Sequence, residues 1–291
     1  MRYLAILFLL VPFISFAQTP IEGGRTFYFH PNGTNTVDCT VQNPCNNLQT
    51  VYDHIRVHFR LITGSIVFQL ADGTYDGMSL QANGAILGQP SPQQFQIIGN
   101  VTNPAAVVIK PTGTRPSFSF AYGAMAYLEG VKMDHSNTSQ DMILIGQYSS
   151  LRINNVEFGY NFNPYNHISV QLHGYLEVVG SYKISGGGQC HILLGNQATT
   201  YFATNGAQGL IGVEITGNPD FLAGFLYLAS NSSANIQAIE WNGTATGRKF
   251  VVEGNSTLDI GGTYLCDIPG NQPGLIKTGG VLLTHPGDFV Q

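Results

Sequence analysis

Three stretches of the sequence resemble one another: AMAYLEGVKMDH (residues 124–135), YSSLRINNVEF (148–158) and HGYLEVVGSYKIS (173–185). Aligned on Leu128, Leu151 and Leu176, they repeat at spacings of 151 − 128 = 23 and 176 − 151 = 25. A period in the twenties, made of short β-type runs between Gly, Asn and Ser, is typical of a solenoid whose repeats stack on one another. The sequence therefore predicts an all-β chain that winds as a coil, with the three leucines stacked inside.

Alternation within each repeat indicates which side chains face inwards. Successive side chains of a strand point to opposite faces, so Val, Ile, Leu and Phe are expected in the core and the polar residues between them in solvent. Later segments at 236–241 and 258–260 are also strand-like, and their spacing of 258 − 236 = 22 restores the period. Gly and Asn supply the tight turns between strands.

The first residues are predicted to be an export signal. Arg2 precedes an apolar run at 4–13 and a small-x-small cleavage site at 15–17, which is the layout of a secretory signal peptide. The apolar run is shorter than the ~20 residues that span a bilayer. We therefore expect a secreted or periplasmic protein without a membrane span. The predicted segments are residues 1–17 (signal peptide), 18–64 (strand, cysteine loop and capping helix), 65–262 (parallel β-helix) and 263–291 (C-terminal tail).

Composition narrows the class of partner. The chain has 12 Lys and Arg against 17 Asp and Glu, a formal net charge of −5. Nucleic-acid binding depends on clustered Lys and Arg, so we expect no nucleic-acid partner, and polar uncharged ligands fit better.

Cys39 and Cys45 enclose a short loop in which an oxidising space favours a local disulfide. Cys190 and Cys266 are expected to be buried free thiols.

One helix is predicted, over residues 47–60. Leu48, Val51, Ile55 and Phe59 recur at intervals of 3, 4 and 4 and form one apolar stripe. An asparagine before the stripe can cap the N-terminus of the helix. Such a helix can cover the first turn of a solenoid, which otherwise presents bare strand edges.

This N-terminal order resembles a known fold. TFYFHPNGT (26–34), the cysteine-bounded loop ending PCNNLQTVYDHI (44–55) and IVFQLADGTY (66–75) resemble the opening of pectate-lyase-like right-handed parallel β-helix proteins. Residues 167–195 and 242–274 are similar to the β-helix proteins of phage and prophage tails. The resemblance implies a right-handed parallel β-helix with an N-terminal capping helix, and a homotrimer, because tail-type β-helices often form trimers. It implies no particular chemistry, since this fold carries lyases, hydrolases, esterases and adhesive proteins.

A candidate catalytic column follows from the alignment. Glu129, Arg152 and Glu177 stand one position after the aligned leucines, so an in-register stack would place them in one outward column with the glutamates ~9.6 Å apart. The acid and base of inverting glycoside hydrolysis are ~6.5–9.5 Å apart, and Arg152 would orient the substrate between them. The alternative interpretation is a surface charge ladder, because structural ion pairs often resemble sites.

A second pair of candidate acids stands six positions after the same leucines. If Asp134 and Glu157 are neighbours, two like charges ~5 Å apart would leave one carboxyl protonated and create an acid beside a base. Asp134 also lies in a turn sequence, where Asp is favoured because it bonds its own backbone.

His54 and His58 stand four positions apart on the predicted helix and could both contact one metal ion, but no third metal ligand is evident in the sequence. We therefore expect neither a metal nor another cofactor.

Aromatic residues point to binding. Tyr160, Phe162 and Tyr165 stand in GYNFNPYN (159–166), a predicted loop among Asn side chains. Rings beside amides suit sugars, which offer apolar faces and many hydroxyls, and rings that fold back onto the solenoid are the alternative. We expect this loop to lie on the same side of the solenoid as the Glu129–Arg152 column.

These features together predict a secreted or virion-associated β-helix protein that binds a polysaccharide or cell-surface glycan, of adhesin or receptor-binding type. The first alternative is a polysaccharide depolymerase, a lyase or glycoside hydrolase that acts through the outward carboxylates. A structural β-helix with no glycan ligand is the second alternative.

Overall fold

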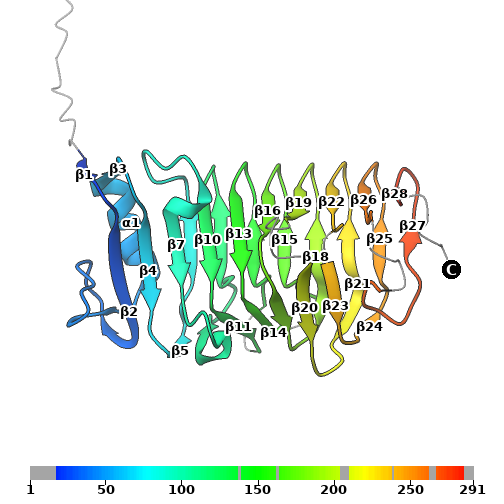
Figure 1. The fold of residues 1–291 in the computed structure, drawn as a ribbon, viewed down its shortest axis with the longest axis horizontal. Coiled ribbons are helices and arrows are strands. Elements are labelled where there is room, and N and C mark those ends of the chain that lie inside the picture. The colour runs from blue at the N-terminus through cyan, green and yellow to red at the C-terminus, as the bar shows by residue number, and fades with distance from the viewer. Residues whose placement is uncertain are drawn as a thin grey trace, which may run out of the picture.

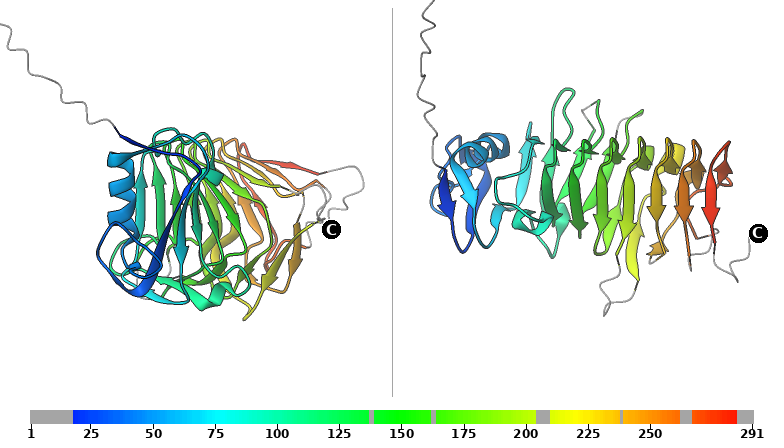
Figure 2. Two further views of the ribbon diagram at one scale, coloured as in Figure 1. Left: turned by 60° about the vertical axis from the view of Figure 1, so that its left-hand side comes forward. Right: turned by 90° about the horizontal axis from the view of Figure 1, so that it is seen from above.

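The chain winds as a parallel β-helix whose turns, or rungs, stack along the long axis of the molecule (Figure 1). The computed structural model describes residues 18–136, 139–161, 164–203, 210–237, 239–261 and 267–284. Within these residues every pairing between strands is parallel, and a full rung contributes one strand to each of three sheets in turn. Viewed from above, the strands of successive rungs lie side by side (Figure 2). The predicted all-β parallel coil is confirmed.

The strands divide among three long sheets and one short pair in the part of the chain that the structure describes. Sheet 1 holds β2 (Arg25–Thr34), β4 (Ile66–Leu70), β7 (Phe95–Ile98), β10 (Met125–Glu129), β13 (Ser150–Asn154), β16 (Tyr175–Val178), β19 (Thr199–Phe202), β22 (Ser233–Asn235), β26 (Thr257–Asp259) and β28 (Val281–Leu283). Sheet 2 holds β5 (Gly73–Asp76), β8 (Val107–Lys110), β11 (Lys132–His135), β14 (Glu157–Asn161), β17 (Tyr182–Ile184), β20 (Ile211–Ile215) and β23 (Ile239–Asn242). Sheet 3 holds β6 (Leu80–Asn83), β9 (Phe118–Ala121), β12 (Ile143–Ile145), β15 (Ile168–Val170), β18 (Gly188–Leu194), β21 (Asp220–Leu228), β24 (Thr246–Gly247), β25 (Phe250–Val252) and β27 (Leu275–Ile276). The short pair is β1 (Thr19–Ile21) with β3 (Phe59–Leu61), and two short 3-10 helices are η1 (Pro92–Gln94) and η2 (Pro104–Ala106).

Apolar side chains fill the coil in columns that run along its axis. One inward column of sheet 1 consists of Phe27, Phe68, Ile97, Leu128, Ile153, Val178 and Phe202. Each of these side chains is at most 1% exposed. Because burial of one such side chain stabilises the fold by ~1.5–3 kcal/mol, the stacked columns supply the main stabilising force.

The register of the first two aligned stretches differs from the predicted one by two positions. Leu151 faces Leu176 as predicted, but Leu128 faces Ile153, and Ala126 faces Leu151. Both rungs are therefore equally long, since 153 − 128 = 25 and 176 − 151 = 25. All three leucines are fully buried in sheet 1. A shift by two positions keeps every side chain on the same face, so alternation alone could not detect it.

Helix α1 (Leu48–His58) lies at the N-terminal end of the coil (Figure 1), where it contacts β6, the first strand of sheet 3. The side chain of Gln49 accepts from the backbone N–H of Gln81 (2.7 Å) and donates to its carbonyl (3.1 Å), as a neighbouring strand would. Tyr52 Oη donates to the carbonyl of Gly84 (2.6 Å). The side chain of Asn47 caps the helix. Edge groups of β6 that would otherwise face water are thus bonded, which is the role expected of a capping helix.

The corner between sheet 3 and sheet 1 repeats one four-residue turn in six successive rungs. The two middle residues of each turn are left-handed, with φ between +52° and +78°. The fourth residue is small and buried in each: Ala124, Ser149, Gly174, Ala198, Ser232 and Ser256. Backbone bonds join turn to turn, as from Tyr148 N–H to the carbonyl of Leu172 (3.2 Å). The side chains of the middle residues are therefore set in columns along this corner.

Candidate functional site

The outward side chains of sheet 1 form a continuous polar and aromatic face. Cross-strand register pairs Tyr127 with Arg152, Arg152 with Glu177, and Glu177 with Tyr201. Tyr175 lies in the neighbouring outward column, and Tyr201 is 41% exposed. The residues that we call the sheet-1 face are Tyr127, Glu129, Arg152, Asn154, Tyr175, Glu177 and Tyr201.

The predicted adjacency of Arg152 and Glu177 is present in the structure. Arg152 donates from Nε to Glu177 Oε2 and from Nη2 to Glu177 Oε1 (3.2 Å). The two side chains are 33% and 13% exposed. A two-point bond between a guanidinium and a carboxylate is stronger and geometrically better defined than a single contact. The pair is therefore an ordered feature of the face.

Glu129 does not share that column. It faces Asn154 across β10 and β13, and its Oε1 accepts from Asn154 Nδ2 (2.6 Å). Its Oε2 accepts from Tyr127 Oη (3.0 Å), a hydroxyl whose pKa burial raises to about 12. The expected column of Glu129, Arg152 and Glu177 is wrong, because the observed register moves Glu129 two places from Arg152. The structure does not bring the two glutamates together across one substrate position.

The expected pair of Asp134 and Glu157 is also wrong. The same register aligns Glu157 with Lys132, whose Nζ lies 2.7 Å from Glu157 Oε1. Ser185 Oγ donates to the same oxygen (2.6 Å). Asp134 accepts from the backbone N–H of Ser136 (3.0 Å), the local bond that its turn sequence favours. Both carboxylates belong to sheet 2, apart from the sheet-1 face.

The predicted aromatic loop lies on another part of the coil. Tyr160 belongs to β14 of sheet 2 and is 52% exposed. Tyr165 is half-buried in the turn before β15, and Phe162 lies outside the described residues. Tyr160 lines a hollow of about 500 Å³ at the corner between sheet 2 and sheet 3, which an exposed Leu222 also lines. The expectation that this loop and Arg152 share one side is therefore wrong.

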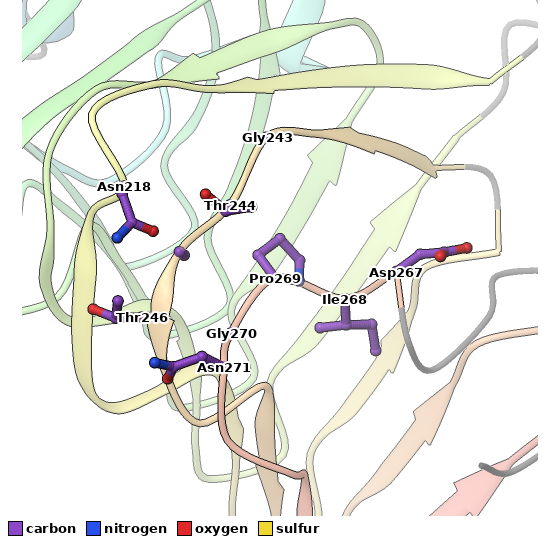
Figure 3. A pocket seen from close by; sticks show the side chains of 10 residues that line it. Asn218, Gly243, Thr244, Thr246, Asp267, Ile268, Pro269, Gly270 and Asn271 are labelled. Carbon is purple, nitrogen blue, oxygen red and sulfur yellow. The ribbon is translucent and has the colours of Figure 1, made fainter.

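A second hollow lies along the same corner, nearer the C-terminus (Figure 3). Its volume is about 280 Å³, and Thr246 and Asn271 are among the residues that line it. Thr246 Oγ1 donates to Asp220 Oδ1 (2.6 Å), and Asn271 Oδ1 accepts from the backbone N–H of Gly247 (3.0 Å). These side chains bond one loop to the next, so they stabilise the stacking of the loops.

Three histidines are buried inside the coil. His135, His167 and His191 are each 0% exposed. His167 Nε2 lies 3.2 Å from the carbonyl of Gly187, which only accepts, so this nitrogen carries the proton. His167 Nδ1 then accepts from His191 Nδ1 (3.1 Å), and His191 Nε2 accepts from Tyr182 Oη (2.9 Å). The hydrogen bonds therefore all run in one direction, from the Tyr182 hydroxyl through His191 and His167 to the carbonyl of Gly187.

His135 is neutral because burial lowers its pKa. Its Nδ1 donates to the carbonyl of Gln140 (3.1 Å), and its Nε2 accepts from Ser117 Oγ (2.8 Å). Burial lowers the pKa of His135 to about 4 and that of His167 to about 3, and it places the pKa of His191 well below 6.5. These rings do not reach solvent, and their nitrogen atoms are hydrogen-bonded inside the coil. The sequence held one signal for them, the one-rung spacing of His167 and His191 (191 − 167 = 24).

The cysteines serve the fold in the described part of the chain. Cys39 and Cys45 form a disulfide at the N-terminal end of the coil. Cys190 is a buried free thiol whose pKa burial raises to about 12, and Cys266 lies outside the described residues. No group of three or more His, Cys, Asp or Glu among the described residues is arranged to hold a metal ion.

No family model, curated protein or solved structure matches this chain. In the ranges that the structure describes, no helix has the length and apolar character needed to cross a membrane.

Proposed function

We propose that this β-helix binds a polysaccharide on the sheet-1 face, as an adhesin or receptor-binding protein. The observation that carries the proposal is the arrangement of Tyr127, Tyr175 and Tyr201 around the paired Arg152 and Glu177 in successive rungs. Tyrosine rings offer apolar area to the faces of sugars, and carboxylate oxygens accept from sugar hydroxyls.

The regular spacing of the rungs suits a polymeric ligand, whose units also recur along its length. Successive strands of sheet 1 stand ~4.8 Å apart, so a sugar chain that lies along the axis of the coil meets another outward polar or aromatic side chain at each rung. Many weak contacts of this kind add up along a polymer, whereas a single sugar would use only one or two of them. The proposed partner is therefore a polysaccharide or cell-surface glycan.

The partners of the carboxylates favour binding over cleavage. Glu177 is bonded to Arg152, and Glu129 to Tyr127 and Asn154. Glycoside hydrolysis needs an acid and a second carboxylate on either side of one bond. The four predicted acids are divided between sheet 1 and sheet 2, and none faces another across a strand pair. We therefore place adhesion before depolymerase activity.

The setting expected from the sequence fits this proposal. A secreted, periplasmic or virion-associated protein meets glycans outside the cytoplasm, and the resemblance to pectate-lyase-like and phage tail-type β-helix proteins includes adhesive members. Assembly as a homotrimer would place three such faces on one particle and raise the avidity for a polymer.

Retention on immobilised polysaccharides tests the proposal. The double variant Tyr175→Ala with Tyr201→Ala removes two rings from the face, and each ring contact is worth ~0.5–1.5 kcal/mol, so we expect binding to weaken about tenfold. Tyr160→Ala is the matched control, because Tyr160 is also half exposed but belongs to sheet 2. Equal retention of the double variant and the control, or failure of the wild type to bind any polysaccharide, would contradict the proposal. Release of reducing ends by the wild type would favour the depolymerase instead.

A further inference from the structure

The repeated turn between sheet 3 and sheet 1 is built from two kinds of residue. In the rungs at 195–198, 229–232 and 253–256, the two left-handed positions hold Asn, Gln, Ser and Gly. In the rungs at 121–124, 146–149 and 171–174, the same positions also hold large side chains. We call these large side chains the ring ridge: Tyr122, Tyr148, Leu172 and His173.

Neither backbone preference nor burial accounts for the ring ridge. Gly and Asn adopt the left-handed region most readily, whereas Leu172 and Tyr148 hold φ of +52° and +62° against their preference. Tyr148 is 73% exposed, Tyr122 67% and Leu172 45%. Exposed apolar groups on an unfavourable backbone contribute little to the core, and this combination is typical of a binding surface.

Tyr148 has one covered ring face and one open side along the column. Its ring stacks on that of His173, with centroids 4.7 Å apart and planes 5° from parallel. On the other side, the equivalent position one rung earlier is Gly123, since 148 − 123 = 25. A Cβ placed on Gly123 would meet no atom within 4 Å. The column of turn side chains therefore has an open place next to Tyr148.

We infer that one sugar ring of the bound glycan occupies this place, stacked on Tyr148 beside Gly123. This inference rests on the proposed function. His173 already lies against Tyr148 at a spacing of 4.7 Å, so a ligand ring at the Gly123 position continues the column at its own interval. Tyr122, 67% exposed in the same turn as Gly123, borders the place.

The chemistry of the turn favours an uncharged sugar. The turns at 121–124, 146–149 and 171–174 contain no Lys, Arg, Asp or Glu. The nearby Arg152 is paired with Glu177, so it offers no unpaired positive charge to an acidic sugar. An aromatic face with amide and hydroxyl neighbours binds a neutral pyranose through its apolar side. Binding at the ridge should therefore be insensitive to salt.

Two substitutions test the site without disturbing the fold. Tyr148→Asn introduces the residue that the same turn position already holds at Asn231 and Asn255, so it removes the ring and suits the backbone. Gly123→Asn fills the open place with a residue that tolerates left-handed φ. Gln197→Asn, at the same position of a turn without rings, is the matched control. We expect Tyr148→Asn and Gln197→Asn to unfold in urea at or above the wild-type midpoint, and Gly123→Asn slightly below it, because the φ of +78° at this position favours glycine.

The readout is retention on a panel of neutral and uronic-acid polysaccharides at low and high salt. Tyr148→Asn and Gly123→Asn should each weaken retention on a neutral polysaccharide roughly fivefold, and Gln197→Asn should not change it. If the double variant of Tyr175 and Tyr201 weakens retention but Tyr148→Asn and Gly123→Asn do not, the ridge site is wrong and the proposed face stands. If only the ridge variants weaken retention, the ridge site stands and the sheet-1 face is wrong. Binding that falls with salt and prefers uronic acids overturns the neutral-sugar assignment, and no retention on any polysaccharide overturns both proposals.

Discussion

Mild acid is expected to unfold this protein, because its buried histidines cannot take up protons in the native state. The native pKa values of His135 and His167 are about 4 and about 3, and that of His191 is well below 6.5. In the unfolded chain the same rings titrate near a pKa of about 6.5. The contribution of these groups to stability is therefore complete above pH 6.5 and is lost as the pH falls from 6.5 toward the native values.

The size of the loss follows from the number of protons. Below pH 6.5 the unfolded chain binds about one more proton than the native state at each ring, which costs ~1.4 kcal/mol per pH unit and per histidine. At pH 4.5 protonation of His135 and of His167 in the unfolded chain has each cost ~2.6 kcal/mol, and His191 adds a loss of the same sign. Burial raises the pKa of Asp141, so this carboxyl binds a proton more readily in the native state than in the unfolded chain. Its protonation on acidification therefore stabilises the fold and offsets part of the loss. The net loss is comparable with the whole stability of a typical domain.

Urea unfolding followed by circular dichroism in steps from pH 7 to pH 4.5 measures the effect. In His135→Gln one of the three buried groups no longer titrates, so the slope of unfolding free energy against pH should fall by about one third. His58→Gln is the control, because His58 is exposed on α1. A midpoint that does not change between pH 7 and pH 5, or an equal slope in wild type and His135→Gln, would contradict this prediction.

Two further predictions concern the core and the cysteines. Leu151→Asp places an unpaired charge in the middle of a buried column and should destabilise the fold by ~4 kcal/mol or more, measured as a lower urea midpoint; a variant that unfolds like the wild type would exclude the stacked core. Cys39 and Cys45 should resist alkylation until reduced, and Cys190 should react only after unfolding because its thiol is buried and its pKa is raised to about 12. Mass spectrometry of the native protein decides the second point, and rapid labelling of Cys190 would contradict it.

The architecture could be predicted from local sequence. Leu128, Leu151 and Leu176 are expected inside the coil, and all three are fully buried in sheet 1. The reason is that the inward or outward direction of a side chain in a strand depends on its parity, which the pattern of apolar residues records. The capping helix is predictable for a related reason, since its apolar stripe has the period of a helix.

The register between rungs is visible only in the folded coil. Leu151 and Leu176 align as expected because they stand a full rung apart, but Leu128 is displaced from Leu151 by two positions. Such a displacement preserves parity, so the sequence pattern is equally compatible with both alignments. The displacement nevertheless exchanges the neighbours of Glu129 and Glu157, and with them the candidate acid pairs.

The candidate sites depend on contacts between residues about one rung apart, and these contacts combine register with turn conformation. The sequence around Tyr148 does not indicate that its backbone is left-handed. A comparison of all six turns would have shown one signal, the small residue at each fourth position, such as Ser149. Likewise, the one-rung spacing of His167 and His191 is visible in the sequence, but only the folded coil determines that both side chains point inward. The direction of a side chain within a strand is a local property of the sequence. The residue that it faces on the next rung, however, depends on the length and geometry of every turn between the two strands.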